Sequence, residues 1–212
     1  MRGTVAEHGA HGFLWALPLT LPCDPSHRRD NCFLPREERM RRSREKGAAA
    51  IAHVRSMGLH DPMEVATFFS YIDEQVPTEL HRSMFTPTIF AQASDEQQKE
   101  WLPLALNYRL LGTYAQTELG HGSFVRGMET TATYDASTDS FILDTPTLTA
   151  TKWWPGNLGR NTTHCVLMAR LITEGVDQGV HAFFLPLRDP ATYKLLPGRI
   201  TGDIGEGRDT RA

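Results

Sequence analysis

Two short segments of the sequence combine glycines with side chains that could contact a flat ligand. The first, residues 112–125 (GTYAQTELGHGSFV), carries Gly120 and Gly122 together with the hydroxyls of Thr117 and Ser123. Glycines let the backbone approach a flat or phosphorylated ligand, and the free N–H groups of such a loop can donate to it. Only G-x-G is present, without the strand-to-helix context of a dinucleotide fingerprint. These residues alone fit either a ligand loop or a plain β-turn.

The second segment, residues 151–162 (TKWWPGNLGRNT), places two tryptophans before a Pro-Gly pair. An indole face of Trp153 or Trp154 beside the backbone of Gly156 could stack on a planar ring system. The alternative is a buried tryptophan cluster that plugs the end of a β-barrel. Stacking on a ligand and filling a core both remain open from the residue types alone.

The elements that must position these segments change character along the chain. Helical patterns come first: Asp61-Pro62 and Pro77-Thr78 each open a helix, Pro87 should kink or split the second, and Ser94 with Gln97 forms a capping box. Short β-branched and aromatic runs follow, with a hairpin turn between residues 135 and 140. Helices followed by strands predict an α+β fold. We expect an extension at 1–30, a helical domain at 31–108, a β-domain at 109–205 and a tail at 206–212.

Composition excludes several classes of protein. The chain has 22 Lys and Arg against 25 Asp and Glu, which argues against nucleic-acid binding through bulk charge. No run reaches the roughly 18 apolar residues of a membrane-spanning helix. Residues 13–23 are apolar but carry two prolines and no cleavage site, so an N-terminal extension is favoured over a signal peptide. The three cysteines and nine histidines lack the spacing of a zinc site.

Taken in order, the runs YAQTELGHGS, ETTATYD, TKWWPGNLGR and HAFFLPLRD resemble the acyl-CoA oxidase family of peroxisomal fatty-acid β-oxidation. The likeness extends from about residue 31 to residue 205. It implies the acyl-CoA dehydrogenase/oxidase architecture, in which an N-terminal helical domain is followed by a β-barrel or sandwich domain. The C-terminal helical bundle of that architecture is expected to be missing from this chain.

The resemblance also implies a flavoprotein. The family oxidises fatty acyl-CoA to trans-2-enoyl-CoA, with hydride transfer to FAD and reoxidation by O₂ that gives H₂O₂. The expected partners are the acyl-CoA substrate and O₂, with a homodimer if the full-length architecture is present. The expected compartment is the peroxisome, although the last three residues, Thr-Arg-Ala, are not a Ser-Lys-Leu-type signal, and the cytosol is the alternative.

Residue by residue, the resemblance assigns Thr117 and Gly156 to flavin binding. Gln116 and Trp154 are expected beside the same cofactor, and Gly122 and Ser123 near the acyl-CoA thioester. The family's catalytic glutamate has no counterpart in this chain.

Glu118 and Glu129, the carboxylates near the glycine loop, are expected to be structural. Because the C-terminal bundle is expected to be missing, the truncated chain is expected to bind FAD weakly and to show little oxidase activity. A non-catalytic acyl-CoA or partner-binding module is the alternative function. A metal-dependent hydrolase that would use some of the nine histidines is disfavoured.

Overall fold

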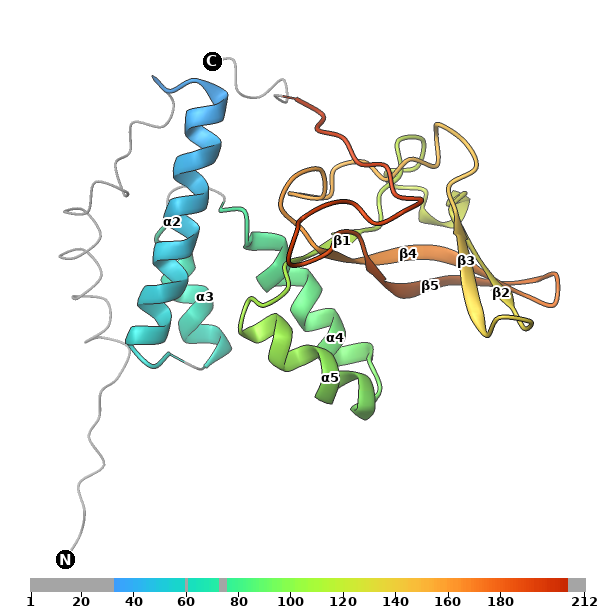
Figure 1. Ribbon diagram of the computed structural model, residues 1–212, viewed down its shortest axis with the longest axis horizontal. Helices are drawn as coiled ribbons and strands as arrows, with labels where there is room; N and C mark the ends of the chain where they lie inside the picture. The colour runs from blue at the N-terminus through green and yellow to red at the C-terminus, as the bar shows by residue number, and fades with distance from the viewer. Residues whose placement is uncertain (1–32, 60, 73–75, 206–212) are drawn as a thin grey trace, which may run out of the picture. The chain divides into compact units, whose positions relative to one another are not determined.

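The computed structural model describes residues 33–59, 61–72 and 76–205 (Figure 1). The segments expected at 1–30 and 206–212 lie outside these residues. The chain divides into two compact units, Met1–Pro77 and Thr78–Ala212.

The first unit contains a long helix, α2 (Arg36–Ser56), and a short one, α3 (Pro62–Ser70). The start of α3 is set by Asp61, whose carboxylate accepts hydrogen bonds from the N–H groups of Met63 and Glu64 at 2.9 and 3.0 Å. Phe68 and Phe69, on the inner face of α3, pack with Ala50 and Val54 of α2. The helix predicted to open at Asp61-Pro62 is thus confirmed.

The second unit begins with helices. A π-helical turn (His81–Phe85) leads into α4 (Thr86–Gln92), and α5 (Asp95–Leu106) follows. The backbone stays helical through Pro87, so the helix is not split there; the irregularity next to this proline is the π-helical turn in front of it. Ser94 accepts from the Gln97 N–H while the Gln97 side chain accepts from the Ser94 N–H, so the capping box is confirmed.

A five-stranded mixed sheet completes this unit, in the order β1-β4-β2-β3 with β5 also paired to β4. The strands are β1 (Gly112–Ala115), β2 (Thr131–Asp135), β3 (Ser140–Asp144), β4 (His164–Thr173) and β5 (Val176–Pro186). The predicted hairpin forms from β2 and β3, with its turn at residues 136–139. Strand β4 is the common partner: it runs parallel to β1 and β2 and antiparallel to β5.

Strands β1 and β2 lie one after the other along the same edge of β4. Gly112–Ala115 pairs with the first part of β4, from His164, and Thr131–Thr133 pairs with the part from Arg170. The connection between them, residues 116–130, leaves this edge and returns to it. The glycine loop is therefore held at both ends by a single strand.

The predicted α+β class is confirmed, and the described strands form an open mixed sheet rather than a closed barrel. Closure requires pairing between the outermost strands, and alternation along single strands does not encode it. Helices cover part of the sheet instead: Phe85 and Ile89 pack with Val166 of β4. The boundary between the two compact units lies after Pro77, whereas the change from helices to strands follows residue 108. The four expected domain limits therefore stay a prediction.

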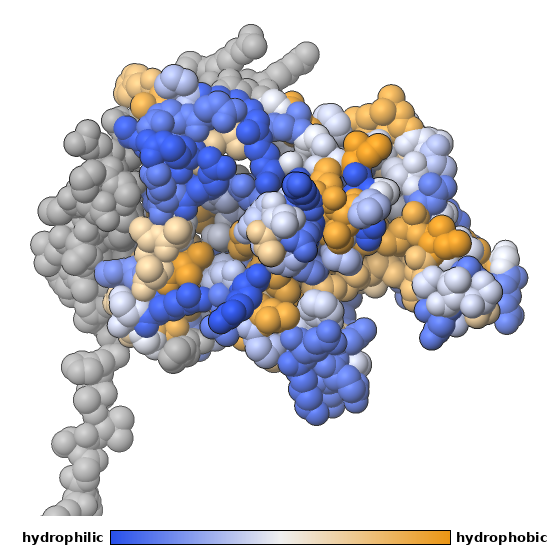
Figure 2. Space-filling view, in the orientation of Figure 1, coloured by the Kyte–Doolittle hydropathy of each residue, from blue (hydrophilic) through white to orange (hydrophobic). Residues whose placement is uncertain are grey.

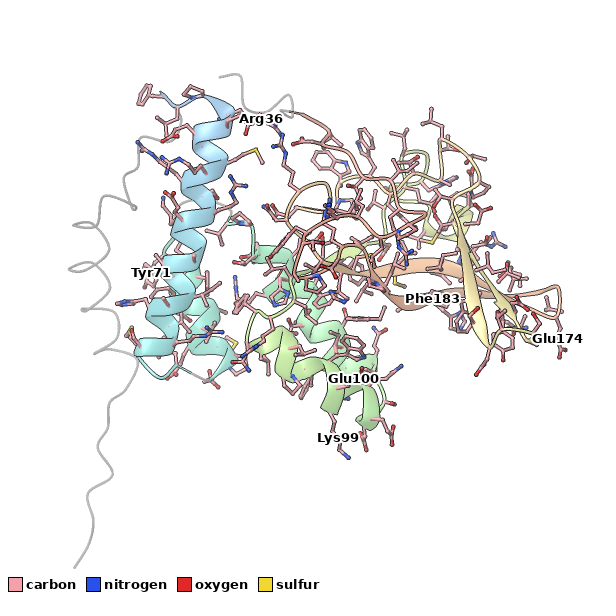
Figure 3. All side chains as sticks on the ribbon, viewed as in Figure 1. Arg36, Tyr71, Lys99, Glu100, Glu174 and Phe183 are labelled. Carbon is pink, nitrogen blue, oxygen red and sulfur yellow. The ribbon has the colours of Figure 1, made fainter. Side chains whose placement is uncertain are left out.

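Hydrophobic surface gathers over the strand-rich unit, as the orange areas of Figure 2 show. Phe141 and Ile142 of β3 are about half exposed, and the Phe141 ring packs edge to face on Phe183 with the centroids 5.3 Å apart. Figure 3 places Phe183 along the sheet and Glu174 at the turn between β4 and β5.

Candidate functional site

The structure brings the two glycine-containing segments together in one corner of the second unit. The Trp153 N–H donates to the Thr117 carbonyl over 2.9 Å, and the Thr113 hydroxyl donates to the Gly156 carbonyl over 2.9 Å. Glu118 and Lys152 form an antiparallel bridge between the same segments. Residues 113–120 thus run alongside residues 149–156, and Thr117 and Gly156 belong to one local structure.

Close backbone approach explains two of the glycines. The Gly120 N–H donates to the Thr149 carbonyl at 2.9 Å, and a Cβ on Gly120 would lie 2.7 Å from the Thr149 Cβ. A Cβ on Gly156 would lie 3.1 Å from the Cδ1 of Leu80, a tighter contact than side chains ordinarily make. Glycine at position 120 thus lets the two segments meet, and glycine at position 156 leaves room for the Leu80 side chain.

A buried carboxylate stands at the centre of the corner. Glu118 is 1% exposed and accepts from the Thr130 N–H and hydroxyl, the Glu129 N–H and the Lys152 ammonium. Burial alone would raise the pKa of Glu118, but these hydrogen bonds outweigh it and lower the pKa to about 2. His121 Nδ1 lies 3.0 Å from the same carboxylate. Glu118 is therefore a fully engaged anion, unsuited to take a proton from a substrate.

Lys152 is the cation that neutralises this carboxylate. Its side chain is 8% exposed, and its Nζ lies 3.1 Å from Glu118 Oε1 and 3.2 Å from the Gln116 carbonyl. Burial lowers the pKa of Lys152, against the opposing influence of Glu118. One ammonium thus ties the segment that carries the tryptophans to the segment that carries Thr117.

Glu129 lies at the outer side of the same network. The hydroxyls of Thr147 and Thr149 donate to its carboxylate and hold the pKa of Glu129 below its usual range. His121 Nε2 lies 3.7 Å from Glu129 Oε1, so this histidine stands between two carboxylates. The arrangement joins loop 118–123 to loop 147–150 and suits the structural roles expected for both glutamates.

The six predicted site residues fall into two groups. Gln116, Thr117, Trp154 and Gly156 belong to the corner, and all but the exposed Trp154 are partly buried. Gly122 and Ser123 lie in an exposed turn beyond His121. The hydrogen bonds between Glu118 and His121 close the preceding turn, at residues 119–120. Apart from chain neighbours, no atom of the described residues lies within 4 Å of a Cβ built on Gly122. The second group therefore lies beside the corner and opens to solvent.

Trp154 has an unusual backbone. Its φ is +77°, in the left-handed region that bulky residues rarely adopt, while its side chain is 69% exposed. Strain of this kind persists only where the surrounding structure over-determines it. Here the Trp153 N–H is bonded on one side and the Gly156 carbonyl on the other, so the backbone that carries the exposed indole is anchored on both flanks.

Three residues that stabilise the corner and the loop after it were not identified from the sequence: Lys152, Thr130 and Arg188. Arg188 is 5% exposed and donates to the carbonyls of Leu158, Gly159 and Thr162, which shapes the loop after the tryptophans. Lys152 and Arg188 could have been found as charged residues inside otherwise apolar or glycine-rich motifs, because a buried charge requires a partner.

Other chemistries find no support in the described part of the chain. It contains no cluster of three or more metal-ligating side chains, and none of its helices has the length and apolar character needed to cross a bilayer. Cys165 is buried, and burial raises the pKa of its thiol to about 12, which makes it a poor nucleophile.

Comparison with known proteins connects this geometry to one family. Residues 24–111 match a family model described as acyl-coenzyme A oxidase N-terminal. Over 185 residues the chain is 44% identical to peroxisomal acyl-coenzyme A oxidase 1 of Phascolarctos cinereus, an alignment that covers 86% of this chain and 28% of that protein. The corresponding Arabidopsis thaliana protein is 45% identical over 183 residues, with 86% and 27% covered.

Solved structures give the same picture. Acyl-CoA oxidase 1 of Arabidopsis thaliana superposes with a TM-score of 0.87 at 42% identity, covering 93% of this chain and 30% of that one. Acyl-CoA oxidase-2 of Caenorhabditis elegans, solved with FAD, ascaroside-CoA and ATP, superposes with a TM-score of 0.83 at 38% identity, covering 93% and 30%. The chain spans less than a third of the length of these relatives.

Proposed function

Since most of this chain belongs to the acyl-CoA oxidase family, we propose that its corner of residues 113–118 and 151–156 forms one wall of a flavin site. The whole protein would oxidise fatty acyl-CoA to trans-2-enoyl-CoA in the peroxisome. In that reaction the substrate loses a proton from its α-carbon and a hydride from its β-carbon, and dioxygen is reduced to hydrogen peroxide. When bound, FAD supplies the hydride acceptor and passes both electrons to dioxygen.

The observation that carries this proposal is the hydrogen bond from the Trp153 N–H to the Thr117 carbonyl. It joins the backbone of Thr117 to that of Trp153, which is followed in the chain by the exposed Trp154 and by Gly156, and a planar three-ring system would lie against these groups. Trp154 would stack on the flank of the ring. Thr117, Gln116 and the Gly156 backbone would contact its polar edge, where a hydrogen-bond donor stabilises charge on the reduced ring.

Substrate would lie on the open side of the glycine loop. Gly122 and Ser123 are exposed, and apart from chain neighbours no atom of the described residues lies within 4 Å of a Cβ built on Gly122, so a thioester could approach the backbone closely there. We assign these two residues to acyl-CoA binding. The base that removes the α-proton would come from outside the described residues, because Glu118 and Glu129 are both held by hydrogen bonds.

The hydrogen bonds that hold both glutamates also support a second candidate function. Because Glu118 and Glu129 are both held by hydrogen bonds, the described part of the chain would then act as a non-catalytic module that binds acyl-CoA or a partner protein. Flavin separates the two proposals, because an oxidase part contributes to a yellow flavoprotein and a binding module stays colourless.

A chimera tests the proposed function directly. The purified chain is titrated with FAD, and peroxide is followed with a long-chain acyl-CoA; we expect weak FAD binding and little peroxide from the chain alone. The matched part of Arabidopsis thaliana acyl-CoA oxidase 1 is then replaced by this chain. We expect the chimera to bind FAD, form a dimer and release peroxide. A folded chimera that holds no flavin would refute the proposal.

A further inference from the structure

Three interactions join consecutive residues of the two segments. Lys152 Nζ donates to the Gln116 carbonyl and to the Glu118 carboxylate, and the Trp153 N–H donates to the Thr117 carbonyl between them. The middle contact is a single backbone hydrogen bond. The outer two share one ammonium. Lys152 therefore holds the Thr117 side of this junction, while the Leu119 N–H, which donates to the Thr151 carbonyl over 2.8 Å, holds the side beyond Glu118.

The ion pair is buried on both sides. The Lys152 side chain is 8% exposed and the Glu118 side chain is fully buried. A buried charge that loses its partner is strongly unfavourable, so neither side chain can leave its place alone. Thr130, the Glu129 N–H and His121 Nδ1 occupy the rest of the Glu118 carboxylate, which fixes the direction from which Lys152 must approach.

The strained tryptophan follows immediately. Trp154, with its φ of +77°, is two residues from Lys152, and the Gly156 carbonyl behind it is held by the Thr113 hydroxyl. A residue in this conformation relaxes unless both flanks are anchored. Lys152 and Trp153 provide the anchor on the N-terminal flank.

We infer that Lys152, through its buried pair with Glu118, is a positioning residue that holds Thr117 and Trp154 in the geometry of the flavin wall. The inference rests on the proposed function for its ligand but not for its geometry. Lys152 does not contact the ligand in this role. It acts through the backbone of residues 116–117 and 153–154.

The test uses a variant that removes the pair without leaving a buried charge. Lys152→Met with Glu118→Gln keeps the side-chain volumes, and the new amide oxygen still accepts from the Thr130 N–H. Arg170→Met is the matched control, because it breaks an exposed ion pair with Asp177 on the same sheet. The single variant Lys152→Met is measured beside them.

Two readouts separate positioning from general stability. Amide hydrogen exchange of the Trp153 N–H should become at least tenfold faster in the double variant, while the amides of β4 keep their wild-type rates. FAD affinity, measured by flavin fluorescence in the chimera, should fall at least tenfold. Arg170→Met should change neither quantity.

Unchanged Trp153 exchange in the double variant would overturn the inference, whatever FAD does. Faster exchange with undiminished FAD affinity would also overturn it, because the corner would then not matter to the ligand. If the wild-type chimera folds but binds no FAD, the proposed function fails, and the exchange data still decide whether Lys152 fixes the corner.

Discussion

The N–H of Gly112, the first residue of β1, donates a hydrogen bond to Nδ1 of His81, a residue 31 positions earlier, over 2.9 Å. The other ring nitrogen lies 3.0 Å from the Ala105 carbonyl, so the proton of the neutral ring belongs on Nε2. His81 is 2% exposed. One neutral imidazole therefore joins the π-helical turn, the end of α5 and the start of β1.

This histidine predicts how stability depends on pH. Burial lowers the pKa of His81 from 6.5 to about 4, against the opposing effect of the Ala105 carbonyl. The unfolded chain takes up a proton below about pH 6.5 and the folded chain does not, so stability falls as the pH drops from about 6.5 to about 4. We expect a loss of about 2–3 kcal/mol over this window.

Urea unfolding followed by tryptophan fluorescence measures the effect. His81→Asn cannot titrate, so it should be less stable at neutral pH but lose less on acidification. Some slope should remain, because burial also lowers the pKa of His164. Equal slopes for wild type and variant would contradict the assignment.

Removing the central carboxylate should be costly. Glu118→Ala leaves the buried Lys152 ammonium and the Thr130 N–H without their acceptor. We expect a loss of about 3–5 kcal/mol in the free energy of unfolding, as for other broken buried ion pairs. The double variant, Lys152→Met with Glu118→Gln, should lose markedly less, because no charge stays buried. The two unfolding curves decide this, and an alanine variant as stable as the double variant would count against a buried pair.

The two glycines of the loop should respond differently to alanine. A Cβ at position 120 meets Thr149 at 2.7 Å, so Gly120→Ala should destabilise by about 1–3 kcal/mol, the usual range for overpacking. Gly122 is two residues away in the same loop and has open space, so Gly122→Ala should change stability by about 1 kcal/mol at most. Thermal unfolding of both variants is the measurement; equal midpoints would show that Gly120 tolerates a side chain.

Trp154 should separate stability from ligand binding. Trp154→Gly removes a bulky residue from a φ of +77°, so we expect the folded chain to be as stable or about 1 kcal/mol more stable. The same change removes the exposed indole, and FAD affinity of the chimera should fall at least tenfold. Trp154→Ala should weaken FAD equally while keeping the strain. A glycine variant with full FAD affinity would exclude stacking by this indole.

Local features of the fold could be read from the residues. Asp61 caps α3 and Ser94 pairs with Gln97 as expected, because these hydrogen bonds join residues at most three positions apart. The β2–β3 hairpin was also predicted, because a short turn joins its two strands. The family likeness of the glycine and tryptophan motifs was also a property of the residues themselves.

Contacts between residues far apart in the sequence were not predicted. Lys152 meets Glu118 across 34 positions, and His81 meets Gly112 across 31. Nothing in either neighbourhood specifies such a partner, since a charge or an imidazole can be satisfied by any group that the fold brings near. The open sheet, in which β1 and β2 share one edge of β4, was missed on the same ground.

The residues by themselves thus determined the helix starts, the strands, the hairpin and the two motifs that point to a flavin. Tertiary structure alone decided which charges hold the motifs together and that the sheet stays open. The physical reason is the range of the forces: caps and turns depend on neighbours a few residues apart, whereas buried ion pairs and strand pairing depend on segments that only folding brings into contact.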